Sequence, residues 1–309
     1  MTQPAFSVVI AAYNAERTII ETIDSVLAQS DADFELIIVD DGSEDLTLPF
    51  LLGKAAADPR IKLATQANQG VSAARNLAVA KARGTYLAFL DADDIWHADK
   101  LAQHRALHDS DPALAASYAR IAFCPDNGDK LKHGRTRSSV PEGYCALEDV
   151  LIENVVCTMS NLVIERKTFH DIGGFRREMR HVEDQDLLVR LVGAGHLLRG
   201  IPETLVGYRM SADGLSCDFV AMLDGWKTLA ERWSHRIDMK RGEALYCRYL
   251  ARRALRSGTT MALARDFVRR GIVSDRKAFL SGGTRGLMTA GAAIAGSAIP
   301  SRARAAIFA

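Results

Sequence analysis

Several features that would place this chain in a specialised class are scarce or absent. Its 309 residues include only five cysteines, without a C-x-x-C pair, so neither a zinc site nor a disulfide framework is expected. Aromatic residues make up 7% of the chain, and few lie among basic residues, which argues against nucleic acid as a partner. The N-terminus lacks the basic and apolar segments of a signal peptide.

Long hydrophobic runs are also missing. The longest weakly apolar tract, Leu287–Ile299, is rich in glycine and alanine and too short to cross a hydrocarbon layer of about 30 Å. The remaining composition, 48% hydrophobic and 25% charged, is that of an ordinary globular protein. We therefore expect a cytoplasmic protein with its own hydrophobic core.

Charge is unevenly distributed along the chain. Trp226–Ala309 holds 17 basic and 5 acidic residues, whereas Met1–Gly225 holds 22 basic and 33 acidic residues. The net charges are therefore +12 and −11, although the whole chain carries only +1. This asymmetry predicts an acidic body, residues 1–215, followed by a basic helical region, residues 216–309.

Short apolar segments alternate with helical patterns in the first hundred residues. This alternation predicts crossover connections and a mostly parallel α/β sheet flanked by helices. Asn14 is expected to cap the first helix and Gly84 to end the helix over Gly70–Ala82. Further on, a helix is predicted over Glu183–Val192. The predicted strands are Phe6–Ala11, Glu35–Val39, Ile61–Ala64, Tyr86–Leu90, Ala115–Phe123, Ser160–Ile164, Leu197–Ile201 and Leu205–Arg209.

Two common nucleotide-binding motifs are absent. The first strand-to-helix turn, Ala11–Glu16, contains no glycine, whereas a dinucleotide-binding turn needs glycines for close approach to the pyrophosphate. No G-x-x-x-x-G-K-[ST] sequence occurs, which excludes a P-loop nucleotide triphosphatase.

Polar side chains nevertheless follow three of the predicted strands. They are Tyr13-Asn14, Asp40-Asp41 and the group Asp91, Asp93 and Asp94. Ligands of open α/β sheets bind outside the carboxyl ends of the strands. Two carboxylates one residue apart repel each other, and Mg²⁺ or Mn²⁺ would relieve that repulsion. The simpler alternative is that these aspartates cap the following helix, and a lone D-x-D favours that alternative.

Five segments together carry a more specific signal. The chain resembles the family 2 glycosyltransferases of GT-A fold over about Phe6–Arg209, with the family's motifs in the same order. This resemblance implies a nucleotide-sugar donor, Mn²⁺ or Mg²⁺ as cofactor, and inversion at the anomeric carbon. The segments are Val8–Asn14, Ile38–Ser43, Asn68–Asn76, Gly84–Asp94 and Glu183–Arg190.

The resemblance also implies roles for individual residues. Asp93 corresponds to the metal ligand of the D-x-D motif. Tyr13 corresponds to the aromatic residue against the base, and Asp41 to the carboxylate that accepts from the base or ribose. Their alternatives are a packing residue and a turn residue, and a surface salt bridge is the alternative for Arg75. The residues expected to bind the nucleotide-sugar are Ala11, Tyr13, Asp41, Arg75, Asn76, Asp91 and Ala92.

Asp184 corresponds to the family's general base. A sugar hydroxyl becomes a good nucleophile only as its proton is removed, so the reaction needs a positioned base. The acidic neighbours Glu183 and Asp186 are expected to raise the pKa of Asp184. Acidic residues that merely stabilise a helix N-terminus are the alternative.

Two features bear on the acceptor. Leu229–Trp233 lacks the glutamine of the Q-x-x-R-W motif of processive synthases, which favours a single addition to a polysaccharide or lipid-linked precursor. Arg248, Arg252 and Arg256 share the spacing of one helix face and could bind an anionic membrane surface. Docking of that face on the acidic body is the alternative.

Two other functions are alternatives to a glycosyltransferase. One is a sugar-nucleotide nucleotidyltransferase, and the other is a non-catalytic carbohydrate- or nucleotide-binding scaffold.

Overall fold

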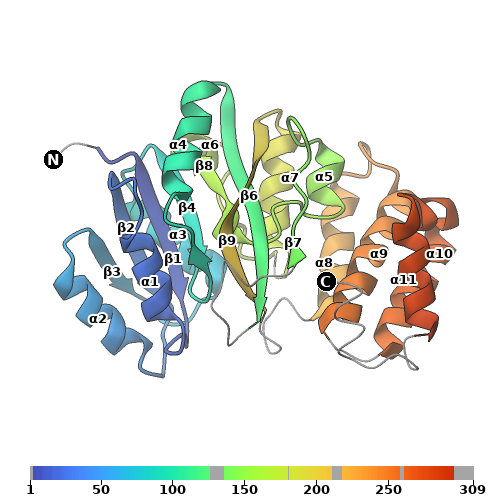
Figure 1. Cartoon of the computed structure of the whole chain (residues 1–309), viewed down its shortest axis with the longest axis horizontal. Coiled ribbons are helices and arrows are strands. Elements are labelled where there is room, and N and C mark those ends of the chain that lie inside the picture. The colour runs from blue at the N-terminus through green and yellow to red at the C-terminus, as the bar shows by residue number, and fades with distance from the viewer. Residues whose placement is uncertain (1–2, 126–135, 180, 211–217, 258–260, 296–309) are drawn as a thin grey trace. The chain divides into compact units, whose positions relative to one another are not determined.

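The computed structural model describes residues 3–125, 136–179, 181–210, 218–257 and 261–295 (Figure 1). The chain divides into two compact units. The first contains Met1–Leu147, Val155–Glu178 and Glu183–Met210, and the second contains Glu148–Asn154, Met179–Val182 and Ser211–Ala309. The predicted division at residue 215 did not anticipate that two short segments from the middle of the chain belong to the second unit.

Half of the sheet in the first unit is parallel. Strands β1 (Phe6–Ala12), β2 (Phe34–Asp40), β3 (Ile61–Thr65) and β4 (Tyr86–Asp91) lie in the order β3-β2-β1-β4, all parallel. β1 and β2 are almost wholly buried, as their unbroken apolar runs predict. These four strands confirm the sequence prediction to within one residue at each end.

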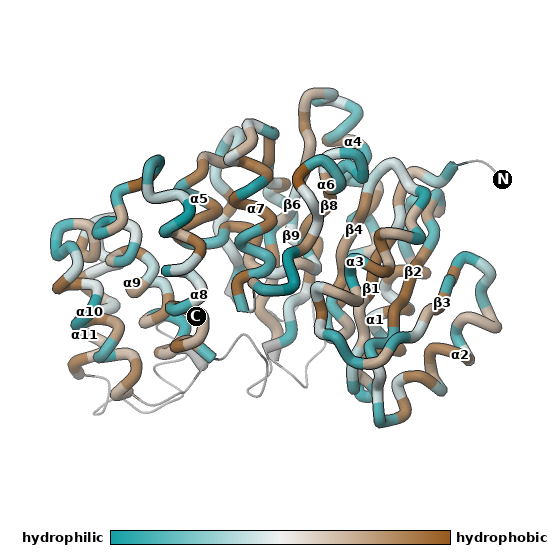
Figure 2. Tube along the Cα trace, turned by 180° about the vertical axis from the view of Figure 1, so that it is seen from behind, coloured by the Kyte–Doolittle hydropathy of each residue, from teal (hydrophilic) through white to brown (hydrophobic). Residues whose placement is uncertain are grey.

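Helices cover both faces of this sheet. Helices α1 (Ile19–Leu27), α2 (Thr47–Ala57) and α4 (Lys100–Ser110) lie on one face (Figure 1). Helices α3 (Val71–Lys81), α6 (Arg166–Asp171) and α7 (Glu183–Gly193) lie on the other (Figure 2). Both faces are therefore shielded from water, which a parallel sheet requires.

The other half of the sheet is mixed. From β4 it continues through β8 (Val163–Glu165), β6 (Leu114–Pro125), β9 (Leu197–Met210) and β5 (Ile95–Trp96), and β7 (Thr136–Arg137) pairs with β6. Here only β6 and β9 are parallel neighbours. The two strands predicted between residues 197 and 209 form the single strand β9, whose register with β6 shifts in the middle. Short elements that the periodicity did not reveal are β5, β7, α5 (Leu147–Leu151) and the 3₁₀ helix η1 (Met159–Asn161).

Two local predictions were wrong. Asn14 does not cap α1, which begins after Thr18; Asn14 instead has φ 47°, and its side-chain oxygen accepts a hydrogen bond from the Glu44 amide. Gly84 does not end α3, because the chain is already extended at Ala82. Glycine is needed at position 84 for another reason: a Cβ atom there would lie 2.4 Å from the amide nitrogen of Ser7.

Strand register brings the predicted site residues to one edge. Ala11 of β1 pairs with Val39 of β2 on one side and with Asp91 of β4 on the other. Tyr13, Asp41 and the Asp91–Asp94 turn therefore all leave the sheet at the carboxyl ends of neighbouring strands. This edge is where an α/β sheet binds its ligands.

The second unit is helical. It contains α8 (Phe219–Arg232), α9 (Met239–Ser257), α10 (Met261–Leu280) and α11 (Thr284–Ala295). Trp226 is fully buried and stacks on Tyr246 with ring centroids 4.9 Å apart, and its indole nitrogen donates to the carbonyl of Leu151 at 2.8 Å. Among the described residues, every helix is too short or too polar to cross a bilayer.

One residue of the predicted arginine face of α9 is internal to this unit. Arg248 is buried, donates to the carbonyls of Phe279 and Ser281, and forms an ion pair with Glu153 at 3.2 Å. The prediction that Arg248 faces a membrane is therefore wrong. The side chain of Arg256 lies outside the described residues.

Candidate active site

Arg75 joins two of the predicted site carboxylates. Its Nη1 lies 2.9 Å from Oδ1 of Asp184, at the start of α7, and its Nη2 lies 2.6 Å from Oδ1 of Asp91, at the end of β4. Oε1 of Glu183 lies 3.8 Å from the same Nη1. Burial alone would lower the pKa of Arg75, but the charges of Asp91, Asp184 and Glu183 raise it. Arg75 is thus a buried cation and not the surface residue of the alternative interpretation.

The position of Arg75 is supported by the turn Gly173-Gly174-Phe175, which the sequence predicts as a turn but not as a neighbour of Arg75. The guanidinium lies 5.2 Å from the ring centroid of Phe175. Asn76 holds that turn, because its side chain donates to the carbonyl and accepts from the amide of Phe175, at 2.8 and 3.1 Å. Arg190 of α7 donates to the carbonyl of Gly174 at 2.7 Å. The polar atoms of Asn76 are therefore directed at the turn and not at the space beside the strand ends.

Asp184 has the environment expected of a base. Burial raises its pKa to about 7 against the opposing effect of Arg75, and the charges of Glu183 and Asp91 act in the same direction as burial. Asp186 does not contribute as expected, because it is buried in an ion pair with Arg190 at 2.7 Å. A carboxyl group with a pKa near 7 is half ionised near neutral pH, which suits proton transfer.

The turn after β4 is held at each of its carbonyl oxygens. The Asp91 carbonyl accepts from the amide of Asp94 at 3.2 Å. Thr18, the residue before α1, donates to the Ala92 carbonyl at 2.9 Å. The next two carbonyls are held by Arg209, which donates to Asp93 O at 2.7 Å, and by Thr22, which donates to Asp94 O at 2.8 Å. The backbone that carries the exposed Asp93 side chain is therefore immobilised.

Two hydroxyl groups hydrogen-bond the carboxylates of this turn. One belongs to Thr158, the residue before η1, and the other to Ser160 in η1. Thr158 donates to Oδ2 of Asp91 at 3.0 Å, and Ser160 hydrogen-bonds the buried Asp94. Oδ1 of Asp94 accepts from the amide of Arg209 at 2.9 Å. Burial, with the charges of Asp93 and Asp91, raises the pKa of Asp94 well above its usual range. Asp94 is thus an internal support for the turn.

Asp41 organises the loop before α3. Its Oδ1 accepts from the Gln66 side chain at 2.6 Å and from the Gln69 amide at 2.9 Å, and its Oδ2 accepts from the Gly70 amide at 2.8 Å. Asp41 is buried, whereas Tyr13 is 48% exposed at the end of β1. Tyr13 therefore offers an accessible ring at the sheet edge, and Asp41 shapes the neighbouring loop.

A divalent cation fits this site only together with a substrate. Among the described residues there is no group of three or more His, Cys, Asp or Glu side chains arranged to hold a metal ion. Asp93 is exposed, and its charge and that of Asp91 already disfavour ionisation of Asp94, so added positive charge would relieve the crowding. Mg²⁺ and Mn²⁺ bind through one or two carboxylates when phosphate oxygens complete the coordination.

The structure therefore brings most of the predicted residues to one edge. Arg75 contacts both Asp91 and Asp184, and Ala11, Ala92 and Asp93 lie at the same strand ends. The supporting residues Thr158, Ser160, Phe175 and Arg209 were missed. Each is a single polar or aromatic residue in a loop or strand end far along the sequence, and no local pattern marks it.

Known proteins resemble this chain in both sequence and structure. The sequence model of the family described as "Glycosyl transferase family 2" matches residues 7–177. The putative teichuronic acid biosynthesis glycosyltransferase TuaG of Bacillus subtilis is 30% identical over 235 residues, covering 75% of this chain and 86% of TuaG. The Escherichia coli enzyme WfgD, named as a UDP-Glc:alpha-D-GlcNAc-diphosphoundecaprenol beta-1,3-glucosyltransferase, is 47% identical over 96 residues, covering 31% of this chain and 37% of WfgD.

Solved structures share the fold across nearly the whole chain. Residues 1–349 of TarS from S. aureus, in complex with UDP-GlcNAc, have a TM-score of 0.62 at 17% identity, covering 98% of this chain and 88% of that one. The mannosyltransferase PcManGT from Pyrobaculum calidifontis, with GDP-Man and Mn²⁺, has a TM-score of 0.59 at 17% identity, covering 99% and 84%. The predicted GT-A fold is confirmed. Since the family match spans more than half of the sequence, the chain belongs to glycosyl transferase family 2.

Proposed function

We propose that this glycosyltransferase transfers a sugar from a nucleotide-sugar, expected to be a UDP-sugar, to an acceptor hydroxyl with inversion of configuration. The observation that carries the proposal is the bridge formed by Arg75 between Asp91 and Asp184. It joins the carboxyl end of β4, where the nucleotide is expected, to a carboxylate whose pKa is raised to about 7. A binding scaffold would not need such a base.

Donor binding is assigned to the strand ends. The exposed ring of Tyr13 would lie against the base, beside Ala11, and the Asp41-supported loop would border it. Asp91 and Ala92 would contact the ribose side of the donor. Arg75 and Asn76 would serve mainly as positioning residues, since Asn76 orients Phe175 and Arg75 orients the two carboxylates.

Proton transfer is assigned to Asp184. In its ionised form it would accept the proton of the acceptor hydroxyl while the oxygen attacks the anomeric carbon and the nucleoside diphosphate leaves from the opposite face. Asp93 would hold Mn²⁺ or Mg²⁺, and such an ion, when bound, neutralises charge on the departing diphosphate. The fixed backbone of the turn keeps Asp93 at the required place.

The relatives support the substrate classes. WfgD is named for a UDP-glucose donor and a diphosphoundecaprenol-linked acceptor, and TuaG for teichuronic acid biosynthesis. One solved neighbour binds UDP-GlcNAc, and another binds GDP-Man with Mn²⁺. A polysaccharide or lipid-linked oligosaccharide precursor is accordingly the proposed acceptor.

The direct test is incubation of the protein with radiolabelled UDP-, GDP- and dTDP-sugars and Mn²⁺. Slow hydrolysis that releases nucleoside diphosphate from one donor is expected, and it should decrease strongly in Asp93→Ala. Asp184→Asn should bind the same donor but should not transfer sugar to an added acceptor. Binding of a donor with neither hydrolysis nor transfer would overturn the proposal, and release of pyrophosphate from a sugar phosphate and a nucleoside triphosphate would indicate a nucleotidyltransferase.

We also propose that the second unit contacts the inner face of the cell membrane through α11. This helix exposes Leu287, Met288 and Ile294, which are 62%, 49% and 71% accessible. No acidic residue follows Asp275 in the sequence, while five basic residues do. Exposed apolar side chains on a helix in a basic segment of the sequence favour contact with an anionic membrane interface.

A further inference from the structure

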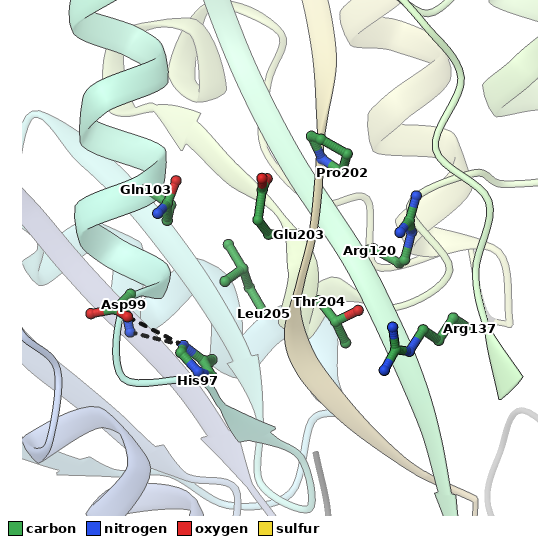
Figure 3. Close-up of a pocket in the computed structure, with 9 residues that line it drawn as sticks. All are labelled: His97, Asp99, Gln103, Arg120, Arg137, Pro202, Glu203, Thr204 and Leu205. Atoms are coloured by element: carbon green, nitrogen blue, oxygen red, sulfur yellow. Dashed lines mark hydrogen bonds and ion pairs between the residues drawn. The ribbon is translucent and has the colours of Figure 1, made fainter. Parts of the chain in front are cut away.

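A hollow in the first unit lies away from the residues assigned to the donor. It has a volume of about 620 Å³, within the ~300–1,000 Å³ of small-molecule sites. None of its lining residues belongs to the set assigned to donor, metal or base. The lining residues are His97, Asp99, Gln103, Arg120, Arg137, Pro202, Glu203, Thr204 and Leu205 (Figure 3).

The hollow arises from an irregularity between β6 and β9. Ala119 pairs with Ile201, but the next residue of β6, Arg120, pairs with Thr204. Pro202 and Glu203 are therefore extra residues of β9 without partners in β6. Such bulges bend a strand and redirect its side chains, and they are frequent beside functional sites.

Two arginines lie together on one side of this hollow. Arg137 of β7 pairs with Ala122 of β6, so Arg120, two residues before Ala122, is its diagonal neighbour on the same face. Figure 3 shows both arginines on one side of the hollow, with His97 and Gln103 on the other side and Glu203 between. Like charges at close positions disfavour each other, and an anion between them would relieve that repulsion.

Among the described residues, neither arginine has an acidic side chain that neutralises it. In the part of the chain that the structure describes, Arg120 and Arg137 form no ion pair with an acidic side chain. This contrasts with Arg60, Arg75, Arg105 and Arg209 of the same unit, each of which is paired with an acidic residue. Paired guanidinium groups match the oxygens of a carboxylate or phosphate, to which each can donate two hydrogen bonds.

The opposite side of the hollow suits hydroxyl groups. Glu203 and Gln103 are exposed polar side chains that can accept hydrogen bonds from hydroxyls, and Thr204 can do the same. Nδ1 of His97 accepts a hydrogen bond from the Asp99 amide at 3.3 Å and lies 3.7 Å from the Asp99 carboxylate. A ligand with an anionic group at one end and hydroxyls at the other would complement both sides.

We propose that this hollow binds an anionic carbohydrate unit, with its carboxylate or phosphate held by Arg120 and Arg137 and its hydroxyls by Glu203 and Gln103. The inference rests on the proposed function, because it makes the hollow a site for part of the acceptor chain. Its lining residues in β9 precede Arg209, the residue that holds the Asp93 carbonyl, by four to seven positions. At about 3.3 Å per residue, that spacing is roughly 13–23 Å, so the unit bound here is not the unit that reacts.

The test measures ligand binding by calorimetry with full-length protein loaded with Mn²⁺ and nucleoside diphosphate. The probes are digalacturonate, glycerol 3-phosphate and the neutral disaccharide cellobiose. Digalacturonate or glycerol 3-phosphate should bind the wild type at least tenfold more tightly than cellobiose does, and the better of the two identifies the anion. Arg120→Gln/Arg137→Gln should weaken that binding by tenfold or more.

The matched control is Lys81→Gln, which removes one exposed positive charge from the end of α3. It should leave binding of the anionic probe unchanged. Donor hydrolysis, measured in parallel, separates the two proposals: it should be equal in the wild type and the double arginine variant. Equal binding of the anionic probe by both proteins, or no preference of the wild type for an anionic probe, would overturn the site even where hydrolysis is normal.

Discussion

Nη1 of Arg75 lies 2.9 Å from Oδ1 of Asp184, and the other terminal nitrogen of the same guanidinium lies 2.6 Å from Asp91. One buried cation therefore sets the distance between the carboxylate assigned to the base and the carboxylate assigned to the nucleotide. Removal of one partner from a buried ion pair is strongly destabilising, by about 3–5 kcal/mol, because it leaves an unpaired charge. We therefore expect Arg75 to affect both stability and chemistry.

We expect Arg75→Gln to reduce transfer by at least a hundredfold and to lower the melting temperature. Arg75→Lys keeps the charge but cannot reach both carboxylates in the same way, so it should recover stability more than activity. The measurement compares thermal unfolding with sugar transfer for each variant. Near wild-type activity in Arg75→Gln would show that the bridge is not needed for the reaction.

The rate of sugar transfer should depend on pH through the ionisation of Asp184. Because its pKa is raised to about 7, the fraction in the ionised, basic form increases as the pH rises through 7. Transfer should therefore increase with pH up to about 8, and a positioned general base contributes roughly 10²–10⁴-fold to the rate. Asp184→Asn should lose that factor and the dependence on pH near 7. An unchanged profile in Asp184→Asn would assign the titration to another group.

The contribution of Asp184 to the free energy of unfolding should change with pH in the direction opposite to that of transfer. Between the ordinary pKa of 3.8 and about 7, the folded protein keeps the Asp184 proton, while the unfolded chain releases it. The folded state thus binds more protons in this window, so the contribution of Asp184 to stability falls as the pH rises. Asp184→Asn, which cannot ionise, lacks this contribution, so its unfolding free energy relative to that of the wild type should be higher at pH 8 than at pH 4. Chemical denaturation at both pH values measures this difference.

The backbone of the D-x-D turn gives a prediction about metal affinity. Arg209 donates to the Asp93 carbonyl and is held in turn by an ion pair with Glu21. Arg209→Ala should raise the Mn²⁺ concentration needed for half-maximal donor hydrolysis by tenfold or more, with a smaller change at saturating Mn²⁺. Arg60→Gln, which removes an ion pair with Asp58 elsewhere in the unit, is the control and should leave the metal dependence unchanged. Equal Mn²⁺ dependence in both variants would contradict a positioning role.

Much of this architecture was predictable because its signals are local. The buried parallel strands β1 and β2 are continuous apolar runs, and the aspartates of the D-x-D stand directly after one such run. Arg75 and Asp184 are more than a hundred residues apart in the sequence, so their contact follows from the fold and was not visible in either motif. The prediction that Asp186 raises the pKa of Asp184 failed for the same reason, because Asp186 forms an ion pair with Arg190 that was not considered.

Two glycines test how closely the first unit is packed. A Cβ atom at position 84 would lie 2.4 Å from the amide nitrogen of Ser7 and 2.6 Å from the carbonyl carbon of Phe6, and neither backbone atom can move aside easily. Gly84→Ala should destabilise the protein by several kcal/mol, more than most single substitutions do. Gly53 lies inside α2 with open space around its Cβ position, so Gly53→Ala should stabilise by about 0.5–1 kcal/mol. Unfolding in denaturant measures both, and a stable Gly84→Ala would show that the strand β1 can shift.

The membrane proposal predicts that the exposed apolar residues of α11 are needed for binding to anionic vesicles. Leu287→Glu/Ile294→Glu replaces two exposed apolar side chains of α11 by acidic ones, so folding should be unaffected while interfacial burial and attraction to anionic lipid are both lost. The wild type should co-sediment with vesicles containing phosphatidylglycerol and less with pure phosphatidylcholine, since each basic residue near an anionic surface contributes about 1 kcal/mol. Val220→Glu, on an exposed site of α8, is the matched control and should bind vesicles like the wild type. If the double variant co-sediments as strongly as Val220→Glu does, α11 is not the membrane-binding element, and its apolar stripe must serve another contact.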